Sequence, residues 1–525
     1  MRFFLLSILF FLAVSGLHGE EIADNDLFRS IVWNLHPNAL WQRKEGVRNL
    51  KVQIPHSQNL PNETFGASAD LDLKKYRGKS VVFSVQLKGE DIPVGKNRAC
   101  CAKLMLCLKD PTGVKYETSG FRIWGTFDWK TFELPCTIPE ECSQLTLMVG
   151  IQSNSGTLYA RSLKVVEKDM FPAPVPLPKN FRCEYTSYYR SLPKLRGVNG
   201  GSLEDNAALA GRWKFNLVRY WIPYGDRDAA LPGLKKELES LKQKLPGYRK
   251  QGVRLILTFP TPGGRYQTPV VLGTAGSLAG KSNEGMNFRV FQEQLWLEAF
   301  LRAWRMTAEM FKDSPEIIGY DLMNEPTQLG KVRNDYLMVQ YLAAKEIRKI
   351  DPERLIVISS NDWSNSASFR YLKPVPLKNV LYQVHFYNPG EYTHQGVSAE
   401  SMERLKKGGF VRYPGMINGV YYDKNRLREV LAPVRAFQKK YGAEIFCGEF
   451  AVINWAPGGA KYLDDILSIL EEYGWMWCFL GTSQSWYGFN PECKFDIYRR
   501  TIKRTTTDQL EVLLRYFAKN PESAL

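Results

Sequence analysis

The chain has 525 residues, which is more than one ordinary domain needs, and 44% of them are hydrophobic, so it can bury more than one core. Its formal net charge is +16. The positive residues are scattered, with no run of five or more, and this pattern favours a solvated basic surface over a nucleic-acid-binding tract.

The first residues of the chain are typical of a secretory signal. One Arg precedes an apolar run from Phe3 to Val14, which is too short to span a bilayer, and small residues follow at Gly16 and Gly19. We therefore predict a signal peptide over residues 1–19 and a secreted or periplasmic protein. No later segment approaches 18 uninterrupted apolar residues, so the sequence predicts no membrane span.

Residues 23–168 have the pattern of an all-β sandwich. Apolar and polar residues alternate in SVVFSVQLKG, KLMLCLKD, QLTLMVGIQ and TLYARSLKVV, and turn residues separate these runs. No segment with a helical period interrupts them. The alternation predicts strands with one face buried, as in two packed antiparallel sheets.

Residues 125–165 resemble the closing strands of jelly-roll carbohydrate-binding modules, in which Trp129 and the turn at 155–157 have counterparts. The resemblance implies a jelly roll and a carbohydrate-binding role; a structural brace for the second domain is the alternative. Trp124 and Trp129 are the aromatic candidates for binding, and a place in the core is the alternative for each. An acidic residue usually follows the last aromatic of that family, but here the chain reads Tyr159-Ala160-Arg161. The family's structural cation site is therefore not expected.

Residues 169–181 read as a linker between two domains. Prolines alternate with other residues at positions 172, 174, 176 and 178, and such a pattern favours an extended polyproline spacer. We therefore expect a second domain over residues 182–525.

In this second region short apolar runs alternate with amphipathic segments. The apolar runs lie at 194–200, 216–222, 253–259, 317–325, 354–360, 379–387, 444–450 and 474–481. Helices are predicted around 234–251, 289–313, 335–350, 422–440, 460–473 and 506–519. Eight strands in β/α order predict a (β/α)8 barrel. A doubly wound open sheet is the alternative, but it would not explain polar residues at so many strand ends.

Two of these strands end in a glutamate. Glu325 follows the apolar run at 317–323, and Glu449 lies near the end of the run at 444–450. In a barrel the carboxyl ends of the strands meet at one face, where catalytic groups collect. Cleavage of a glycosidic bond needs two such carboxyl groups, one protonated and one ionised. Arg219 near Glu449 would favour its ionised form.

The motifs at 196–199 (RGVN), 216–219 (NLVR), 323–326 (MNEP), 384–387 (VHFY) and 447–450 (CGEF) resemble the successive signatures of glycoside hydrolase family 5, the cellulase family. The resemblance spans about residues 185–520. It implies a retaining enzyme with Glu325 as acid/base and Glu449 as nucleophile. It further implies that Asn324 binds the sugar 2-OH, while Arg219, His385 and Tyr387 position the nucleophile and its sugar.

The chain departs from the family pattern at two places. A His common at the end of the third strand is replaced by Thr258-Phe259-Pro260. The aromatic platform after the eighth strand has Trp477 and Trp486 as candidates, and Cys478 or Phe479 are alternatives for the usual place. Both departures leave the identity of the sugar open.

Other chemistries are weakly supported. The nine Cys include no CxxC motif, so most are expected to be buried thiols, although Cys136 and Cys142 could close a hairpin. Only His385 and His394 occur after residue 60, so we expect no metal and no cofactor. AGSLAGKS at 275–282 fits a relaxed phosphate loop, but it does not directly follow a strand.

The sequence thus predicts an exported, monomeric, retaining β-glycosidase that acts on a β-glucan or β-mannan polysaccharide or oligosaccharide. An exo-acting β-glycosidase of the same clan is one alternative. A catalytically weak or inactive glycan-binding barrel is another, and the presence of Glu325, Glu449 and Arg219 argues against it.

Overall fold

The computed structural model describes residues 26–44, 46–56, 60–61, 63–96, 99–110, 113–120, 123–168, 173–201, 206–222, 231, 233–259, 289–292, 294–327, 333–482 and 488–520. The chain forms two compact units. The first comprises residues up to Met170, except for segments 108–115 and 141–144, which group with the second. Within the described ranges, no helix combines the length and the apolar character that a membrane crossing requires. The predicted signal peptide and residues 275–282 lie outside these ranges.

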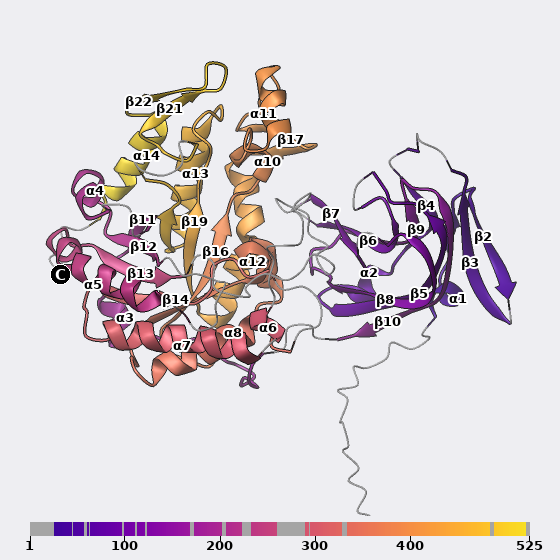
Figure 1. The fold of residues 1–525 in the computed structure, drawn as a ribbon, viewed down its shortest axis with the longest axis horizontal. Helices are drawn as coiled ribbons and strands as arrows, with labels where there is room; N and C mark the ends of the chain where they lie inside the picture. Colours follow the sequence, from indigo (N-terminus) through magenta and orange to yellow (C-terminus); the bar gives the residue numbers. More distant parts are fainter. Residues whose placement is uncertain are drawn as a thin grey trace, which may run out of the picture. The chain divides into compact units, whose positions relative to one another are not determined.

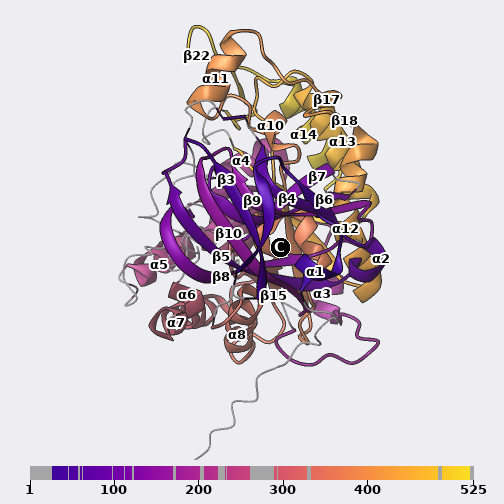
Figure 2. The ribbon, with the colours of Figure 1, turned by 90° about the vertical axis from the view of Figure 1, so that its right-hand side faces the viewer.

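The first unit is an antiparallel β-sandwich, as the sequence predicted (Figures 1 and 2). One sheet has the strand order β1-β4-β9-β6-β7 and the other the order β2-β3-β10-β5-β8. The strands are β1 Asn34–Leu35, β2 Ala39–Lys44, β3 Val47–Ile54, β4 Thr64–Asp70, β5 Ser80–Ile92, β6 Ala102–Asp110, β7 Gly113–Thr118, β8 Gly125–Thr137, β9 Gln144–Gln152 and β10 Gly156–Glu167. Two short helices, α1 Leu27–Ser30 and α2 Leu73–Tyr76, accompany them.

The period-two alternation of β5 shows why these segments form a sandwich. Phe83, Val85 and Leu87 are completely buried, whereas the residues between them are partly exposed. Successive side chains of a strand point to opposite faces, so one face of β5 supplies the core and the other remains in contact with solvent. All nine cysteines of the chain are thiols and seven of them are buried, so the possible bridge between Cys136 and Cys142 is not formed.

The second unit contains a closed barrel of eight strands in the order β11-β12-β13-β14-β15-β16-β19-β20, which confirms the predicted (β/α)8 architecture. The strands are β11 Arg196–Gly201, β12 Leu217–Trp221, β13 Arg254–Thr258, β14 Ile317–Asp321, β15 Leu355–Ser359, β16 Val380–Phe386, β19 Glu444–Phe450 and β20 Met476–Phe479. All pair in parallel. Residues 173–181, before the barrel, form neither helix nor strand.

Helices surround this barrel (Figure 1). They are α4 Asn206–Trp213, α5 Leu234–Lys250, α6 Arg289–Gln292, α7 Gln294–Phe311, α8 Tyr336–Arg348, α12 Lys424–Tyr441, α13 Gly459–Glu472 and α14 Asp508–Phe517. Shorter elements are α3 Ser187–Ser191, α9 Asn361–Ser364, η2 Ser366–Arg370, α10 Gly390–Thr393 and α11 Ala399–Lys406. Helix α5 buries Leu234, Leu238, Leu241 and Leu245. This spacing of three or four residues places them on the single face that packs against the barrel.

One end of the barrel is filled and closed. A buried cluster contains one or two apolar side chains from most of the strands: Leu195, Leu217, Ile256, Ile318, Leu355, Val357, Leu381, Phe446, Met476 and Cys478. The segment before β11 packs Tyr185, Tyr188, Tyr189 and Leu192 against this cluster. Chemistry is therefore confined to the opposite end, where the strands have their carboxyl termini.

Two hairpins extend the connections at that end. β17 Gly415–Ile417 pairs with β18 Val420–Tyr422 between β16 and β19. β21 Cys493–Asp496 pairs with β22 Thr501–Arg504 after β20. Both hairpins lie beyond the carboxyl ends of the strands, on the side where Figure 1 also places α11.

Candidate active site

Arg219, in the middle of β12, organises the open end of the barrel. Its side chain is completely buried, and its guanidinium donates to Asp321 Oδ2 (2.6 Å), Glu449 Oε1 (2.6 Å), Asn199 Oδ1 (3.0 Å) and Asn324 Oδ1 (2.8 Å). Burial alone would lower its pKa, but Asp321 and Glu449 outweigh burial and raise the pKa of Arg219 above its usual value. Arg219 is therefore a permanent cation that fixes four acceptors at once.

Glu449, near the end of β19, is held at both carboxylate oxygens. Oε1 accepts from Arg219, and Oε2 accepts from the hydroxyl of Tyr387 at 2.9 Å. Burial, reinforced by the charges of Glu449 and Glu325, raises the pKa of Tyr387 well above its usual value, so the phenol remains a hydrogen-bond donor. Donors on both oxygens stabilise the carboxylate form of Glu449.

Glu325 lies in a different environment on the opposite side of the opening. Its side chain is 18% exposed, and Oε1 lies 2.9 Å from Nδ1 of His385 on β16. We expected β14 to end at Glu325, but the strand ends at Asp321. Glu325 has a φ of 47°, in the left-handed region, and Pro326 follows it, so the chain leaves the strand ladder before the glutamate.

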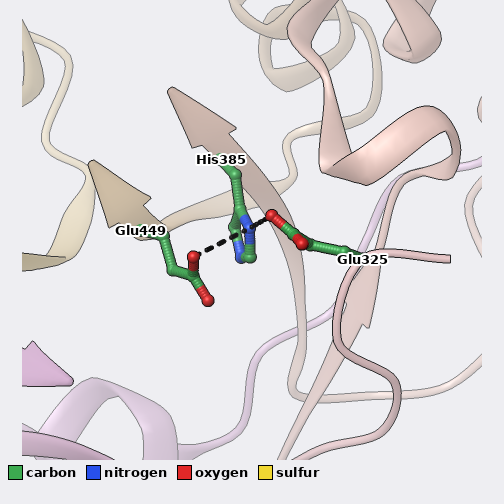
Figure 3. A group of neighbouring side chains, drawn as sticks. All are labelled: Glu325, His385 and Glu449. Carbon is green, nitrogen blue, oxygen red and sulfur yellow. Dashed lines mark hydrogen bonds and ion pairs between the residues drawn. The ribbon is translucent and has the colours of Figure 1, made fainter. Parts of the chain in front are cut away.

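The two glutamates and His385 form a compact trio (Figure 3). Ligating atoms from all three side chains lie within 4.8 Å of one another, and His385 Nδ1 is 3.6 Å from Glu449 Oε2. Such a set could hold a metal ion, but Arg219 occupies one oxygen of Glu449 and its positive charge opposes a cation there. Two carboxyl groups with unlike partners are instead suited to acid/base and nucleophilic chemistry.

The structure brings together most of the residues that the sequence singled out. Asn199 links Arg219 to β19: its Oδ1 accepts from Arg219, and its Nδ2 donates to the carbonyl of Gly448 at 2.9 Å. Asn324 is 8% exposed and is oriented by Arg219. These two amides, Arg219 and the trio all gather at the carboxyl ends of the strands.

The aromatic residues proposed as a substrate platform after the eighth strand are not part of the described site. Trp477 is completely buried, its indole donates to Glu471 Oε1 (2.9 Å), and its ring packs on Phe517 of α14. It faces the helical layer, so the prediction that Trp477 binds substrate is wrong. Trp486 lies outside the described residues. At the end of β13, Thr258 is buried and Phe259 packs on Trp304, so neither supplies the imidazole common in the family.

Sequence reasoning missed a supporting layer beneath Arg219. Asp321 accepts from Arg219 and also from Gln383 Nε2, at 3.1 Å to each oxygen, and Gln383 donates to Ser359 Oγ at 2.6 Å. Gly448 leaves room for this layer, because a Cβ there would clash with the side-chain amide of Gln383, which is hydrogen-bonded to Asp321 and Ser359. The available signal was an Asp inside an otherwise apolar strand, since buried charges are rare unless paired.

His394 was also missed as part of the site. Its ring lies 4.9 Å from that of Tyr387 and 5.3 Å from that of Phe489, and its Nδ1 lies 2.9 Å from Thr393 Oγ1. Burial, opposed by the charge of Glu449, lowers the pKa of His394 to about 4. A neutral imidazole therefore supports the ring of Tyr387 at ordinary pH.

Comparison with known proteins identifies the family of the barrel. Residues 193–484 match the family model described as cellulase (glycosyl hydrolase family 5). Among curated proteins, Endoglucanase C of Acetivibrio thermocellus is 26% identical over 250 residues, covering 43% of this chain and 69% of that protein. Cellodextrinase A of Ruminococcus flavefaciens is 24% identical over 279 residues, covering 52% and 75%.

Among solved structures, Thermotoga maritima Cel5A in complex with cellobiose aligns with a TM-score of 0.47 and 20% identity, covering 62% of this chain and all of that one. The family model spans more than half of the chain and includes both Glu325 and Glu449. The chain is a glycoside hydrolase and belongs to the cellulase family, glycosyl hydrolase family 5.

Proposed function

We propose that this enzyme is a retaining β-glycosidase that hydrolyses a β-linked glucan or mannan by double displacement. The observation that carries the proposal is the spacing of Glu325 and Glu449, whose ligating oxygens lie within 4.8 Å. Retaining enzymes place their carboxyl groups ~5–5.5 Å apart, whereas inverting enzymes need ~6.5–9.5 Å to admit a water molecule.

Glu449 is the nucleophile in this proposal. Arg219 and Tyr387 hold both of its oxygens in one geometry, which positions the carboxylate for attack. One oxygen forms a bond to the anomeric carbon as the bond to the leaving-group oxygen breaks. The product of this step is a glycosyl ester of Glu449.

Glu325 is the acid/base. The imidazole of His385 contacts Glu325, whereas the permanent cation Arg219 contacts Glu449, so the two carboxyl groups have the unlike partners that an acid and a nucleophile need. In the first step Glu325 gives a proton to the departing oxygen. In the second step it takes a proton from the water that cleaves the ester and releases the sugar.

The remaining residues position the sugar and the nucleophile. Asn324 is oriented by Arg219 and is placed to bind the 2-OH, while His385 lies between the two glutamates. The names of the curated relatives, an endoglucanase and a cellodextrinase, support a β-glucan substrate. We further propose that the protein is exported and monomeric, with a sandwich at 23–168, a linker at 169–181 and a catalytic domain at 182–525.

Two variants test these roles on a polysaccharide substrate and on an aryl β-glycoside with a good leaving group. Glu449→Gln should lose activity on both, because no ester can form. Glu325→Ala should lose about 10²–10⁴-fold on the polysaccharide. It should keep much of the rate of the first step on the aryl glycoside, whose departure needs no proton.

Equal losses of Glu325→Ala on both substrates would contradict the acid/base role. Absence of hydrolysis by the unmodified enzyme on any β-glucan or β-mannan, with retained binding, would instead favour an inactive glycan-binding barrel. The sandwich, by its resemblance to carbohydrate-binding modules, is proposed to bind polymer and concentrate the enzyme on it.

A further inference from the structure

The β21–β22 hairpin carries an unusual concentration of positive charge. Its residues 493–504 include Lys494, Arg499, Arg500, Lys503 and Arg504 but a single acid, Asp496. These five cations are all exposed. Within the described part of the chain, none of the five has a carboxylate partner within ion-pair distance.

Two of the lysines are placed directly opposite each other. Lys494 on β21 is the register partner of Lys503 on β22, so both side chains project from the same face of the hairpin. Like charges at opposed positions destabilise a strand pair. The one acid of the hairpin, Asp496, closes the turn: its Oδ1 accepts from the backbone N–H groups of Tyr498 and Arg499, both at 2.9 Å.

The opposite face of the hairpin attaches it to the rim of the active site. Phe495 packs on Trp455 at 5.3 Å, and Trp455 follows Glu449 by six residues. Trp455 Nε1 donates to Gln395 O at 2.8 Å, which ties this wall to the loop that carries His394. Figures 1 and 2 both show the hairpin beside α11 at this edge of the barrel.

The hairpin also lies close to the catalytic groups along the chain. Phe489 contacts the ring of Tyr387, with centroids 6.5 Å apart, and Tyr387 donates to Glu449. Lys494 follows Phe489 by five residues, which span at most ~18 Å of extended chain. Lys494 therefore lies within ~18 Å of Phe489 along the chain, a span comparable to a substrate strand of a few sugar units.

We propose that the face bearing Lys494 and Lys503 binds anionic substituents, carboxylates or sulfate esters, on the polysaccharide as it leaves the cleft. The inference rests on the proposed glycosidase function and deepens it by naming a charged substrate class. A membrane surface fits less well. The exposed Ile502 pairs with Phe495 on the face opposite the lysines, whereas interfacial elements present apolar and cationic groups to the same surface.

The test uses two soluble substrates with the same β-glucan backbone, carboxymethyl cellulose and the uncharged hydroxyethyl cellulose. In the full-length enzyme, Lys494→Gln/Lys503→Gln should raise KM for the carboxymethyl polymer about 3- to 10-fold, the range that two exposed ion pairs supply. Its kcat, and both constants on hydroxyethyl cellulose, should be unchanged. Added salt should raise the KM of the unmodified enzyme for the charged polymer and have less effect on the variant.

A matched control removes two exposed lysines from the outer helix α5, in Lys236→Gln/Lys250→Gln, and should leave both KM values unchanged. The single variant Lys503→Gln should give a smaller, same-direction effect if the double variant folds poorly. Equal changes on both polymers, or no change on either, would overturn the proposal. Loss of binding to anionic lipid vesicles with no change on carboxymethyl cellulose would overturn it in favour of a membrane.

Affinity electrophoresis separates this proposal from the glycosidase proposal. Glu449→Gln should migrate more slowly in gels that contain carboxymethyl cellulose, and the added lysine substitutions should restore its mobility. If the unmodified enzyme hydrolyses neither polymer but this retardation is seen and is lysine-dependent, the glycosidase proposal fails and the anion site stands. If hydrolysis occurs without lysine-dependent retardation, the anion site fails alone.

Discussion

The guanidinium Nε of Arg219 lies 2.6 Å from the carboxylate Oδ2 of Asp321, and neither side chain is exposed to solvent. Arg219 also bonds Glu449, so one cation is shared by two buried carboxylates from different strands. Asp321 fixes the direction from which Arg219 approaches the nucleophile. The catalytic geometry thus depends on a residue in the layer beneath it.

Asp321→Asn should lower both stability and kcat. Removal of one charge from a buried ion pair lowers the free energy of unfolding by about 3–5 kcal/mol. The guanidinium of Arg219, no longer held by Asp321, can then move relative to Glu449. Denaturant unfolding and steady-state kinetics measure the two effects. Glu316→Gln is the control, because Glu316 forms a 2.6 Å pair with Arg249 on α5, remote from the trio. The control should lose stability while its kcat is retained; equal kcat losses would contradict the positioning role of Asp321.

The pair of Arg196 and Glu471 should make stability depend on acid pH. Burial would raise the pKa of Glu471, but hydrogen bonds from Arg196 and Trp477 and the charges of Arg196 and Lys194 lower it from 4.5 to about 2. As pH falls, Glu471 is protonated in the unfolded chain before it is protonated in the folded protein. Its contribution to the free energy of unfolding is therefore fully present above pH 4.5 and is lost as pH falls towards 2. At about 1.4 kcal/mol per pKa unit, this contribution to the free energy of unfolding is at most about 3 kcal/mol, and solvent screening of the half-buried group reduces it.

Denaturant titrations of Glu471→Gln between pH 6 and pH 2 check this linkage. The stability difference from the unmodified enzyme should be largest at pH 6 and should shrink towards pH 2. Glu472→Gln is the adjacent control, since Glu472 pairs with Arg428 at the surface and should matter much less. A stability difference of Glu471→Gln that does not vary with pH would show that the pair does not titrate as described.

His394 should act as a neutral support for Tyr387 rather than as a titrating group. Burial lowers the pKa of His394 to about 4, so its imidazole stays neutral and does not change protonation state above pH 5. His394→Phe keeps an aromatic ring against Tyr387 and should retain kcat within about threefold with an unchanged pH profile. His394→Ala removes the support and should lower kcat about 10-fold or more. A shifted acid limb in His394→Phe would mean that His394 titrates during turnover.

Much of this architecture follows from local pattern. The apolar runs between turn signals predicted all eight barrel strands. The polar residues at the ends of those strands predicted that Glu325, His385 and Glu449 meet at one face of the barrel. The prediction that Trp477 binds substrate was wrong because a shift of one position along a strand reverses the direction of the side chain. Cys478 faces the interior cluster and its neighbour Trp477 faces the helices. Asp321 and Gln383 could not be assigned without the barrel, because their partners come from distant strands.

Trp124 and Trp129 should respond differently to replacement. Trp124 Nε1 donates to the carbonyl of Cys100 at 2.8 Å, so Trp124→Ala should lower the stability of the sandwich. Trp129 is half-buried on β8, and Arg161 stacks 4.0 Å above its ring. Trp129→Ala should weaken binding to insoluble polysaccharide and leave kcat/KM on a short soluble glycoside unchanged. Unchanged polymer binding in pull-down measurements would make Trp129 structural and remove it as a binding residue.

The stereochemistry of the first product tests the central claim of double displacement most directly. Proton NMR during the first minutes of hydrolysis distinguishes the anomers of the newly formed reducing end before they equilibrate. Glu325 and Glu449, with oxygens within 4.8 Å, predict the β-anomer first, followed by slow appearance of the α-anomer. The α-anomer as the first product would show single displacement by water and would contradict the roles assigned to both glutamates.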